Sequence, residues 1–376
     1  MDSEIIYYRL LQEHLDKLPI GYPKTNSGVE IRILQLLFTP IEVKVALCLS
    51  LGNASVETVR KRIGKKFGIS YVPDKVATIL HDMFMKGAIS RSNSEPFKYS
   101  NAMLAIGMFE NQLGELSKEM MELIHQYFDE GFNDEFFKSS LPQLRASPHM
   151  KAIVPEFNIA TYDNMREIVE KTNKSIQVAN CVCKEGEAIL GKPCKQTKDI
   201  EVCLMFDAKN YLDRGKARTI TKDECMEIIN RAEREGLVLQ PGNSLQPFCI
   251  CLCCGCCCGV LTSAKKYEKP AELIAHNFYA KVEEELCSGC TICVDRCQMS
   301  AIQIENKKAI IDLDRCIGCG LCVTTCKKEA LCLLEKTKKT IPPRNVAMLY
   351  LGILSHKVSK RRMMGNMLKL LTGKQL

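Results

Sequence analysis

Apolar residues recur at helical spacing in three consecutive segments near the N-terminus, at 41–51, 55–66 and 73–86. Pro73 suits the first turn of the third helix, where the missing N–H group of proline leaves nothing unsatisfied. Residues 88–100 have Ser, Asn and Pro at their centre, which favours a two-stranded hairpin. The pattern therefore predicts three short helices followed by a small hairpin.

This order of elements is similar to a winged helix-turn-helix, a fold that serves protein docking as readily as the reading of DNA. The third helix lacks the row of Arg, Asn or Gln residues expected for base contacts, so we do not expect DNA as the partner. The second helix carries a basic surface that either faces phosphates or is simply solvated. This surface comprises Arg60, Lys61, Arg62, Lys65 and Lys66.

Two further helices are expected, at 103–111 and 117–128. They would complete an N-terminal domain of residues 1–147 or form the contact surface of a homodimer.

From about residue 148 the composition shifts towards cysteine, and a short helix is expected at 163–172. Thr221 and Glu224 form a Thr-x-x-Glu capping box ahead of apolar positions at helical spacing. Gly236 ends that helix. Residues 148–275 are therefore expected to form an irregular, cysteine-rich α+β domain.

The excess of positive charge lies in the C-terminal tail. The chain of 376 residues has a net charge of +8, and residues 336–376 contain ten basic and no acidic residues. Residues 344–371 predict an amphipathic helix, with Lys360, Arg361 and Arg362 among its basic positions. This helix could dock on a partner subunit, enter a membrane surface that contains anionic lipids, or fold back onto its own domains.

The opening residues, MDSEIIYYRLL, include acidic residues and lack the apolar core of a signal peptide. No apolar run reaches the roughly 20 residues that a membrane-spanning helix needs. We therefore expect a cytoplasmic protein with reduced cysteines, which its basic tail could attach to the inner face of the membrane.

Eight cysteines form two copies of C-x2-C-x2-C-x3-C, repeated after 29 residues. In each copy three thiolates surround one [4Fe–4S] cube, and the fourth cysteine completes the other cube. A zinc ribbon has two C-x2-C pairs and does not need cysteines at the third and fourth positions. The expected ligands are Cys287, Cys290, Cys293 and Cys326 for cluster I, and Cys316, Cys319, Cys322 and Cys297 for cluster II.

This segment resembles the bacterial two-cluster ferredoxins over roughly residues 278–334. The proline usual after each fourth cysteine is replaced by Gln298 and by Lys327, which bears on the local backbone and not on the number of clusters. Alternating apolar residues around a polar turn at 305–308 predict a hairpin. Low-potential clusters near the surface are sensitive to oxygen, which favours an anaerobic cytoplasm.

Two further groups of cysteines precede this segment. Seven cysteines lie within 249–258, and because adjacent side chains of an extended chain point apart, they cannot all face one metal. One further cube, candidate cluster III, would take Cys181, Cys183, Cys194 and Cys203. The candidate ligands of another cluster are Cys251, Cys253, Cys254, Cys256, Cys257 and Cys258.

The order of these pieces is similar to that of largely uncharacterised iron–sulfur proteins of anaerobes, which implies a redox role and no particular substrate. The sequence Cys253-Cys254-Gly255 is similar to the CCG motif of heterodisulfide-reductase-type subunits, although no unclaimed C-x2-C pair accompanies it. We expect one or two additional [4Fe–4S] or unusual clusters, with zinc or a redox-active dithiol set as alternatives. Cys48, Cys225 and Cys332 are expected to act as small hydrophobes.

The sequence thus predicts a multidomain α+β protein. Its expected parts are a winged-helix-like domain with a helical extension at 1–147, a cysteine-rich cluster-binding domain at 148–275, a bacterial dicluster ferredoxin domain at 276–335, and a basic amphipathic tail at 336–376.

Motifs of nucleotide-binding loops and of catalytic nucleophiles are absent from the sequence. The expected function is the transfer of single electrons to a redox protein partner or a larger oxidoreductase complex. One alternative is a redox-sensing regulator that binds DNA. The other is a reductase that uses an unusual cluster in the cysteine-dense segment.

Overall fold

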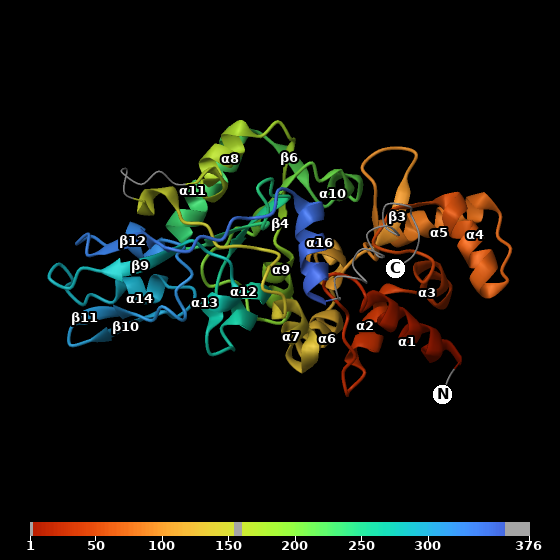
Figure 1. Ribbon diagram of the computed structural model, residues 1–376, viewed down its shortest axis with the longest axis horizontal. Helices are drawn as coiled ribbons and strands as arrows, with labels where there is room; N and C mark the ends of the chain where they lie inside the picture. The colour runs from red at the N-terminus through yellow and green to blue at the C-terminus, as the bar shows by residue number, and fades with distance from the viewer. Residues whose placement is uncertain (1–2, 154–159, 358–376) are drawn as a thin grey trace. The chain divides into compact units, whose positions relative to one another are not determined.

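The computed structural model describes residues 3–153 and 160–357 (Figure 1). The chain is divided into two units. Unit 1 comprises Met1–Ser140, Lys209–Arg214 and Tyr350–Leu376. Unit 2 comprises Leu141–Ala208 and Gly215–Leu349. The segments predicted as a cysteine-rich domain and as a ferredoxin domain therefore belong mainly to the same unit.

Helices of unit 1 form where apolar stripes are buried. Val59 and Ile63 bury one side of α4, and Leu80 and Phe84 bury one side of α5. The main elements are α1 (Ser3–Leu15), α2 (Val29–Leu37), α3 (Pro40–Ala46), β1 (Ala54–Ser55), α4 (Val56–Phe67), α5 (Pro73–Met85), β2 (Ile89–Arg91), β3 (Lys98–Asn101), α6 (Lys118–Tyr127), α7 (Asn133–Phe137) and α10 (Lys209–Asp213).

The three helices and the hairpin expected between residues 41 and 101 are present, although the first helix ends early, at Ala46. Thr39 starts α3 with a capping box: its side chain accepts a hydrogen bond from the Glu42 N–H group, and the Glu42 carboxylate accepts one from the Thr39 N–H group at 2.7 Å. Strands β1, β3 and β2 form a small antiparallel sheet in that order. The interpretation of these elements as a winged helix-turn-helix stays a prediction.

The prediction of a helix at 103–111 is wrong. Ala105 has an extended backbone, with φ of −89° and ψ of 136°, and Ile106 has a left-handed φ of 53°. The Glu110 carboxylate accepts a hydrogen bond from the Gly107 N–H group at 2.7 Å, so a side chain replaces the helical partner. Because Leu104, Ala105 and Met108 are all buried, packing within the unit overrides the helical spacing of the sequence.

Most of the basic surface of α4 already has partners within unit 1. Arg60 makes two hydrogen bonds to the Glu57 carboxylate, at 2.7 and 2.9 Å, and Lys61 lies 3.6 Å from the same carboxylate. Arg62 donates to the Cys48 carbonyl, and Lys66 donates to the Leu47 carbonyl. The surface therefore offers less unpaired positive charge than its sequence indicates.

One short segment of the predicted cysteine-rich domain belongs to unit 1. Arg214, which follows α10, donates to the Phe84 carbonyl at 2.8 Å and to the Asn111 side-chain oxygen at 2.7 Å. Its guanidinium lies 4.1 Å from the centroid of the Phe84 ring. These contacts hold residues 209–214 against the helices of unit 1.

Unit 2 contains a five-stranded antiparallel sheet with the order β6-β4-β5-β8-β7, which is more regular than the sequence predicts. Other elements of this part are helices before, between and after the strands. The bounds are α8 (Met165–Lys171), β4 (Ile176–Asn180), α9 (Val182–Ile189), β5 (Glu201–Phe206), β6 (Arg218–Ile220), α11 (Lys222–Glu235), β7 (Val238–Pro241), β8 (Cys249–Cys253), α12 (Gly259–Ala264) and α13 (Pro270–Leu273).

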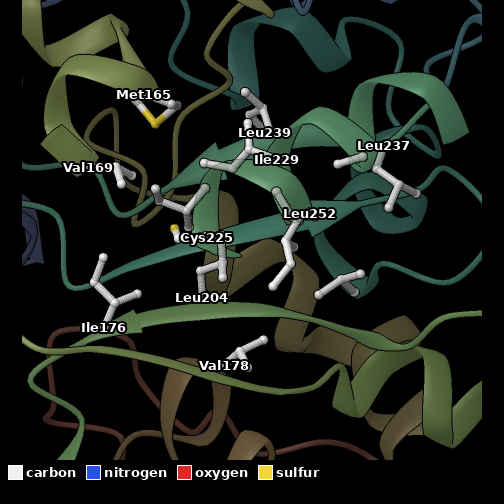
Figure 2. Packing of buried hydrophobic residues seen from close by; sticks show 14 of the residues in the cluster. Met165, Val169, Ile176, Val178, Leu204, Cys225, Ile229, Leu237, Leu239 and Leu252 are labelled. Carbon is white, nitrogen blue, oxygen red and sulfur yellow. The ribbon is translucent and has the colours of Figure 1, made fainter. Parts of the chain in front are cut away.

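One face of this sheet packs against α8 and α11. Figure 2 shows Met165 from α8, with Cys225 and Ile229 from α11, beside Leu204 and Leu252 of the strands. Each of these side chains is buried, and Cys225 acts as a small hydrophobe, as expected. Since strand residues alternate between faces, the odd-numbered cysteines of β8 lie on the opposite face.

The segment 278–335 forms two short antiparallel strand pairs and two short helices. β9 (Phe278–Val282) pairs with β12 (Leu331–Glu335), and β10 (Ile302–Glu305) pairs with β11 (Lys308–Ile311). The turn between β10 and β11 has the positive φ angles at Asn306 and Lys307 that a tight two-residue turn requires. The helices are α14 (Ile292–Arg296) and α15 (Leu321–Thr324).

The C-terminal helix α16 (Val346–Lys357) is described only to residue 357, so the basic positions Lys360, Arg361 and Arg362 lie outside the described residues. Lys357 donates to the Glu135 carboxylate and to the Asp16 carbonyl, both at 2.6 Å, within unit 1. This end of the helix therefore folds back onto its own unit. Among the described helices, none combines the length and the apolar character needed to cross a bilayer.

His14 makes the stability of unit 1 depend on pH. Burial lowers its pKa to about 4, although a hydrogen bond to the Leu49 carbonyl at 2.9 Å acts in the opposite direction. His14 therefore becomes protonated near pH 6.5 in the unfolded chain but only near pH 4 in the folded chain. The free energy of unfolding that its burial contributes is present above pH 6.5 and is lost as the pH falls towards 4.

We predict that the wild-type protein loses about 2 kcal/mol more of unfolding free energy between pH 7 and pH 5 than His14→Gln does. Denaturant unfolding of unit 1 measures this difference, and His81→Gln, on the exposed side of α5, is the control. Parallel pH profiles for the wild type and His14→Gln would contradict the prediction.

Candidate metal centres

The backbone of the segment 286–331 repeats the pattern of its cysteines. Positive φ angles occur in pairs 29 residues apart, which is the same period as the cysteine runs. The pairs are Gly289 with Gly318, Thr291 with Gly320, and Ser300 with Glu329. The two runs therefore have the same local conformation, and each presents three cysteines from a loop and the following helix.

Two glycines in this repeat permit close approach of backbones. A Cβ atom at Gly318 would lie 2.1 Å from the Phe278 carbonyl oxygen, and one at Gly289 would lie 2.4 Å from the Lys307 carbonyl oxygen. Both residues also have the left-handed φ that glycine adopts at no steric cost. Each cysteine loop is thus packed directly on a strand or a turn of the same segment.

The four expected ligands of cluster II line one cavity. Cys297 comes from the first run, and the other three come from the second run. Burial raises the pKa of Cys319 to about 12, and the neighbouring Cys297 and Cys316 thiols act in the same direction. Apolar residues, Ile302 and Leu321 among them, complete the wall. The geometry therefore brings together the set Cys316, Cys319, Cys322 and Cys297.

The four expected ligands of cluster I also lie together. Burial raises the pKa of Cys293, and the nearby thiols of Cys287, Cys290 and Cys326 raise it further. The fourth cysteine again comes from the other run. Both sets therefore show the crossed arrangement that the spacing predicts, while the binding of iron by these eight cysteines stays a prediction.

Backbone N–H groups donate hydrogen bonds to several of these sulfur atoms. Ala301 donates to Cys297 Sγ at 3.2 Å, and Ala309 donates to Cys287 Sγ at 3.3 Å. Ala280 donates to Cys316 Sγ at 3.5 Å. Such bonds stabilise negative charge on thiolates and would tune the reduction potential of any bound cluster.

The cysteines of β8 and of the following turn divide between the two faces of the large sheet. Cys251 on β8 is the register partner of Cys203 on β5. Cys254 belongs to the apolar core on the face of α8 and α11. Cys253 is buried as well, but it follows the alternation of the strand to the other face. The cysteines around β8 therefore form two thiol groups.

The first thiol group, named here the Cys194 group, comprises Cys194, Cys254, Cys256 and Cys257. Lys184, which is only 1% exposed, donates to Cys194 Sγ at 3.3 Å and to Cys254 Sγ at 3.1 Å. Hydrogen bonds from Cys194 and Cys257 lower the pKa of Cys254, and the Lys184 ammonium adds to this effect. The surroundings of the group therefore favour the thiolate form of Cys254.

The second thiol group, named here the Cys181 group, lies between α9, β8 and α12. Cys183 hydrogen-bonds to Cys181 and lowers its pKa, while the nearby Cys253 raises the pKa of Cys181 and the nearby Cys258 raises the pKa of Cys183. The Gln240 side chain donates to Cys258 Sγ at 3.5 Å. The group comprises Cys181, Cys183, Cys253 and Cys258, with Cys203, Cys249 and Cys251 beside it on the sheet.

The thiols that lie together in the structure are not the sets expected from the sequence. Cys194 is expected from the sequence to lie with Cys181, Cys183 and Cys203, whereas in the structure it lies with three cysteines of the dense segment. Conversely, Cys181 and Cys183 lie with Cys253 and its neighbours. The reason is the alternation of β8, which separates consecutive cysteines, combined with the pairing of β5 and β8. Which of them bind iron stays a prediction.

The Cys194 group adjoins the ferredoxin-like segment through one close contact. Gly255 donates to the Gln298 side-chain oxygen at 2.8 Å, and a Cβ atom at Gly255 would lie 2.1 Å from the Gln298 carbonyl oxygen. Lys265 donates to the Gly255 carbonyl at 2.5 Å and is close to both Cys256 and Cys297. A ligand of cluster II and the dense cysteine turn are therefore adjacent.

Sequence reasoning missed Lys184, Gln298 and Lys265. Lys184 gave no signal, because lysine is nearly always exposed and a buried one is recognised only from its surroundings. Gln298 did give a signal, since it replaces the usual proline, but the sequence could not show that its side chain accepts a hydrogen bond from Gly255.

We predict that Gly318→Ala destabilises unit 2 by several kcal/mol more than Gly215→Ala. Both glycines have a left-handed φ, which costs alanine about 1 kcal/mol, but only at Gly318 does the new methyl group meet backbone. Thermal unfolding of the anaerobic protein measures the difference. Equal effects of the two substitutions would show that the loop at Gly318 yields freely.

Residues 286–331 match the family model of the 4Fe-4S dicluster domain. No curated protein and no solved structure matches the chain. The matched range contains both cysteine runs in full, together with β10, β11, α14 and α15. This segment of the chain is therefore a 4Fe–4S dicluster domain.

Proposed function

We propose that the protein transfers single electrons through two [4Fe–4S] clusters in residues 286–331. The observation that supports this most strongly is the crossed gathering of the cysteines, in which each set of four takes three thiols from one run and one from the other. The dicluster match covers the same residues. When bound, the clusters would supply one-electron redox chemistry, and the chain would supply ligands, burial and N–H donors.

The two ligand sets are close enough to interact with each other. The thiol of Cys293 in the cluster I set lies close enough to Cys322 of the cluster II set to raise the pKa of Cys322. These cysteines belong to α15 and α14, which pack together. An electron on one site therefore has a short path to the other, as a relay needs.

We further propose that the relay extends to a third cluster at the Cys181 group. Its four thiols come from the start of α9, from the last residue of β8 and from the N-cap of α12, and backbone N–H groups of Gly259 and Leu261 bond to Cys183 and Cys258. The contact between Gly255 and Gln298 connects the dense segment to the residue after Cys297. This continuity supports an electron path beyond cluster II.

A larger redox protein or complex is the partner that suits such a relay, because the chain shows no catalytic motif of its own. We propose that the N-terminal helices and the basic tail dock this partner, with a homodimer through the N-terminal helices as the other arrangement, in the cytoplasm. A DNA-binding role finds less support, since Arg60, Arg62 and Lys66 have partners within unit 1.

Iron and sulfide analysis of the anaerobic protein tests the relay. We predict about eight iron and eight sulfide per chain for two clusters, and about twelve of each if the third cluster is present. Stepwise reduction followed by electron paramagnetic resonance would show each cluster taking up one electron. Zinc, or no metal, in the segment 286–331 would contradict the proposal.

Cys322→Ser removes one ligand of cluster II, and we predict that it lowers the count by up to four iron and alters or abolishes one paramagnetic signal. Cys332→Ser is the matched control, because Cys332 lies on β12 outside both ligand sets. Identical metal content in the two variants would show that Cys322 is not a ligand.

A further inference from the structure

The Cys194 group is the tightest collection of thiols in the described residues. The Sγ atom of Cys256 lies 3.4 Å from that of Cys254 and 3.6 Å from that of Cys257. The Sγ atom of Cys194 lies 3.6 Å from that of Cys254 and 4.0 Å from that of Cys256. All four sulfur atoms lie within 4.8 Å of one another.

These distances suit one metal ion better than a cube. Four thiolates at about 2.3 Å from a tetrahedral ion have sulfur atoms about 3.8 Å apart. A [4Fe–4S] cube holds its thiolates farther apart, because each binds a different iron atom. In the part of the chain that the structure describes, this is the one group of three or more Cys, His, Asp or Glu side chains gathered closely enough for a single ion, and the eight ferredoxin-type cysteines are not so gathered.

The local fold explains how adjacent cysteines can face the same point. Strand β8 ends at Cys253, and residues 255–257 form a turn, so the alternation of the strand no longer separates Cys256 from Cys257. Cys194 approaches from the loop after α9. Gly255 has no side chain, which lets the turn lie directly against Gln298.

The charges around the group suit an ion with four thiolate ligands. Such a centre has a charge of about −2 with a divalent metal. The Lys184 ammonium is buried and donates to two of the sulfur atoms, so the anion that offsets its charge is thiolate. Lys265 lies near Cys256 and Cys254 and supplies a second positive charge.

We propose that Cys194, Cys254, Cys256 and Cys257 bind a single tetrahedral metal ion, zinc or ferrous iron. The ion fixes the turn at 255–257 against Gln298, and thus against the loop that carries Cys297 of the cluster II set. The site is closed, because all four positions of the tetrahedron are taken by thiolates. This proposal does not depend on the proposed electron relay, and either one can hold without the other.

Metal analysis of the full-length anaerobic protein and of Cys194→Ser tests this site. We expect the variant to lose about one zinc or about one iron per chain, with an unchanged content of acid-labile sulfide. Which of the two metals is lost identifies the ion. Cys225→Ala is the matched control, because Cys225 is buried in the same unit and lies outside the group, and it should keep the full metal content.

A second measurement uses the wild type, so it tests the site even if Cys194→Ser fails to fold. X-ray absorption at the zinc edge should show four sulfur atoms at about 2.3 Å, or, if the ion is iron, Mössbauer spectra should contain an isolated tetrahedral ferrous component. Loss of about four iron and four sulfide in Cys194→Ser would show a cube and overturn the proposal. Retention of all metal in that variant would overturn it as well. The paramagnetic signals of the ferredoxin-type clusters report on the relay separately.

Discussion

Each candidate site in unit 2 depends on the convergence of thiols from segments that are distant in the sequence. Four sulfur atoms must meet in one place, and no single stretch of chain can present them all, because neighbouring residues point in different directions. In the dicluster domain, the last cysteine of each run completes the other set. In the large sheet, the pairing of β5 with β8 and the turn after Cys253 have the same effect. The fold of unit 2 thus brings thiols from distant segments of the chain together.

Convergence has a cost that the surrounding residues must offset. Burial and the neighbouring thiols raise the pKa of Cys319, so a thiolate is unfavourable there until a cation binds, and metal binding must release protons. At the Cys194 group, part of the compensation is built into the chain, since Lys184 places a positive charge among the sulfur atoms. The contact between Gly255 and Gln298 then joins the two kinds of site into one body of protein.

The sequence predicted those features that depend on local spacing. Two ferredoxin-type runs, the hairpin turn at Asn306 and Lys307, and the helix from Lys222 that Gly236 ends were all evident from residue types at fixed intervals. The capping box at Thr221 is half present, because the Thr221 side chain accepts from the Glu224 N–H group.

Features that depend on tertiary packing could not be predicted. The helix expected at 103–111 is replaced by an extended residue and a left-handed residue, because burial decides the backbone there. The sequence pattern does not predict the five-stranded sheet. Strands β4 and β8 are short and buried on both faces, so they lack a clear alternation of polar and apolar residues. Without that sheet, the partners of Cys194 and Cys203 could not be deduced.

The most direct test of the electron relay is spin quantitation of the fully reduced, anaerobic protein. Our account predicts at least about two unpaired spins per chain, with spectra broadened by the interaction of neighbouring clusters in residues 286–331. A reduced protein with no paramagnetic signal, and with zinc bound in that segment, would contradict it.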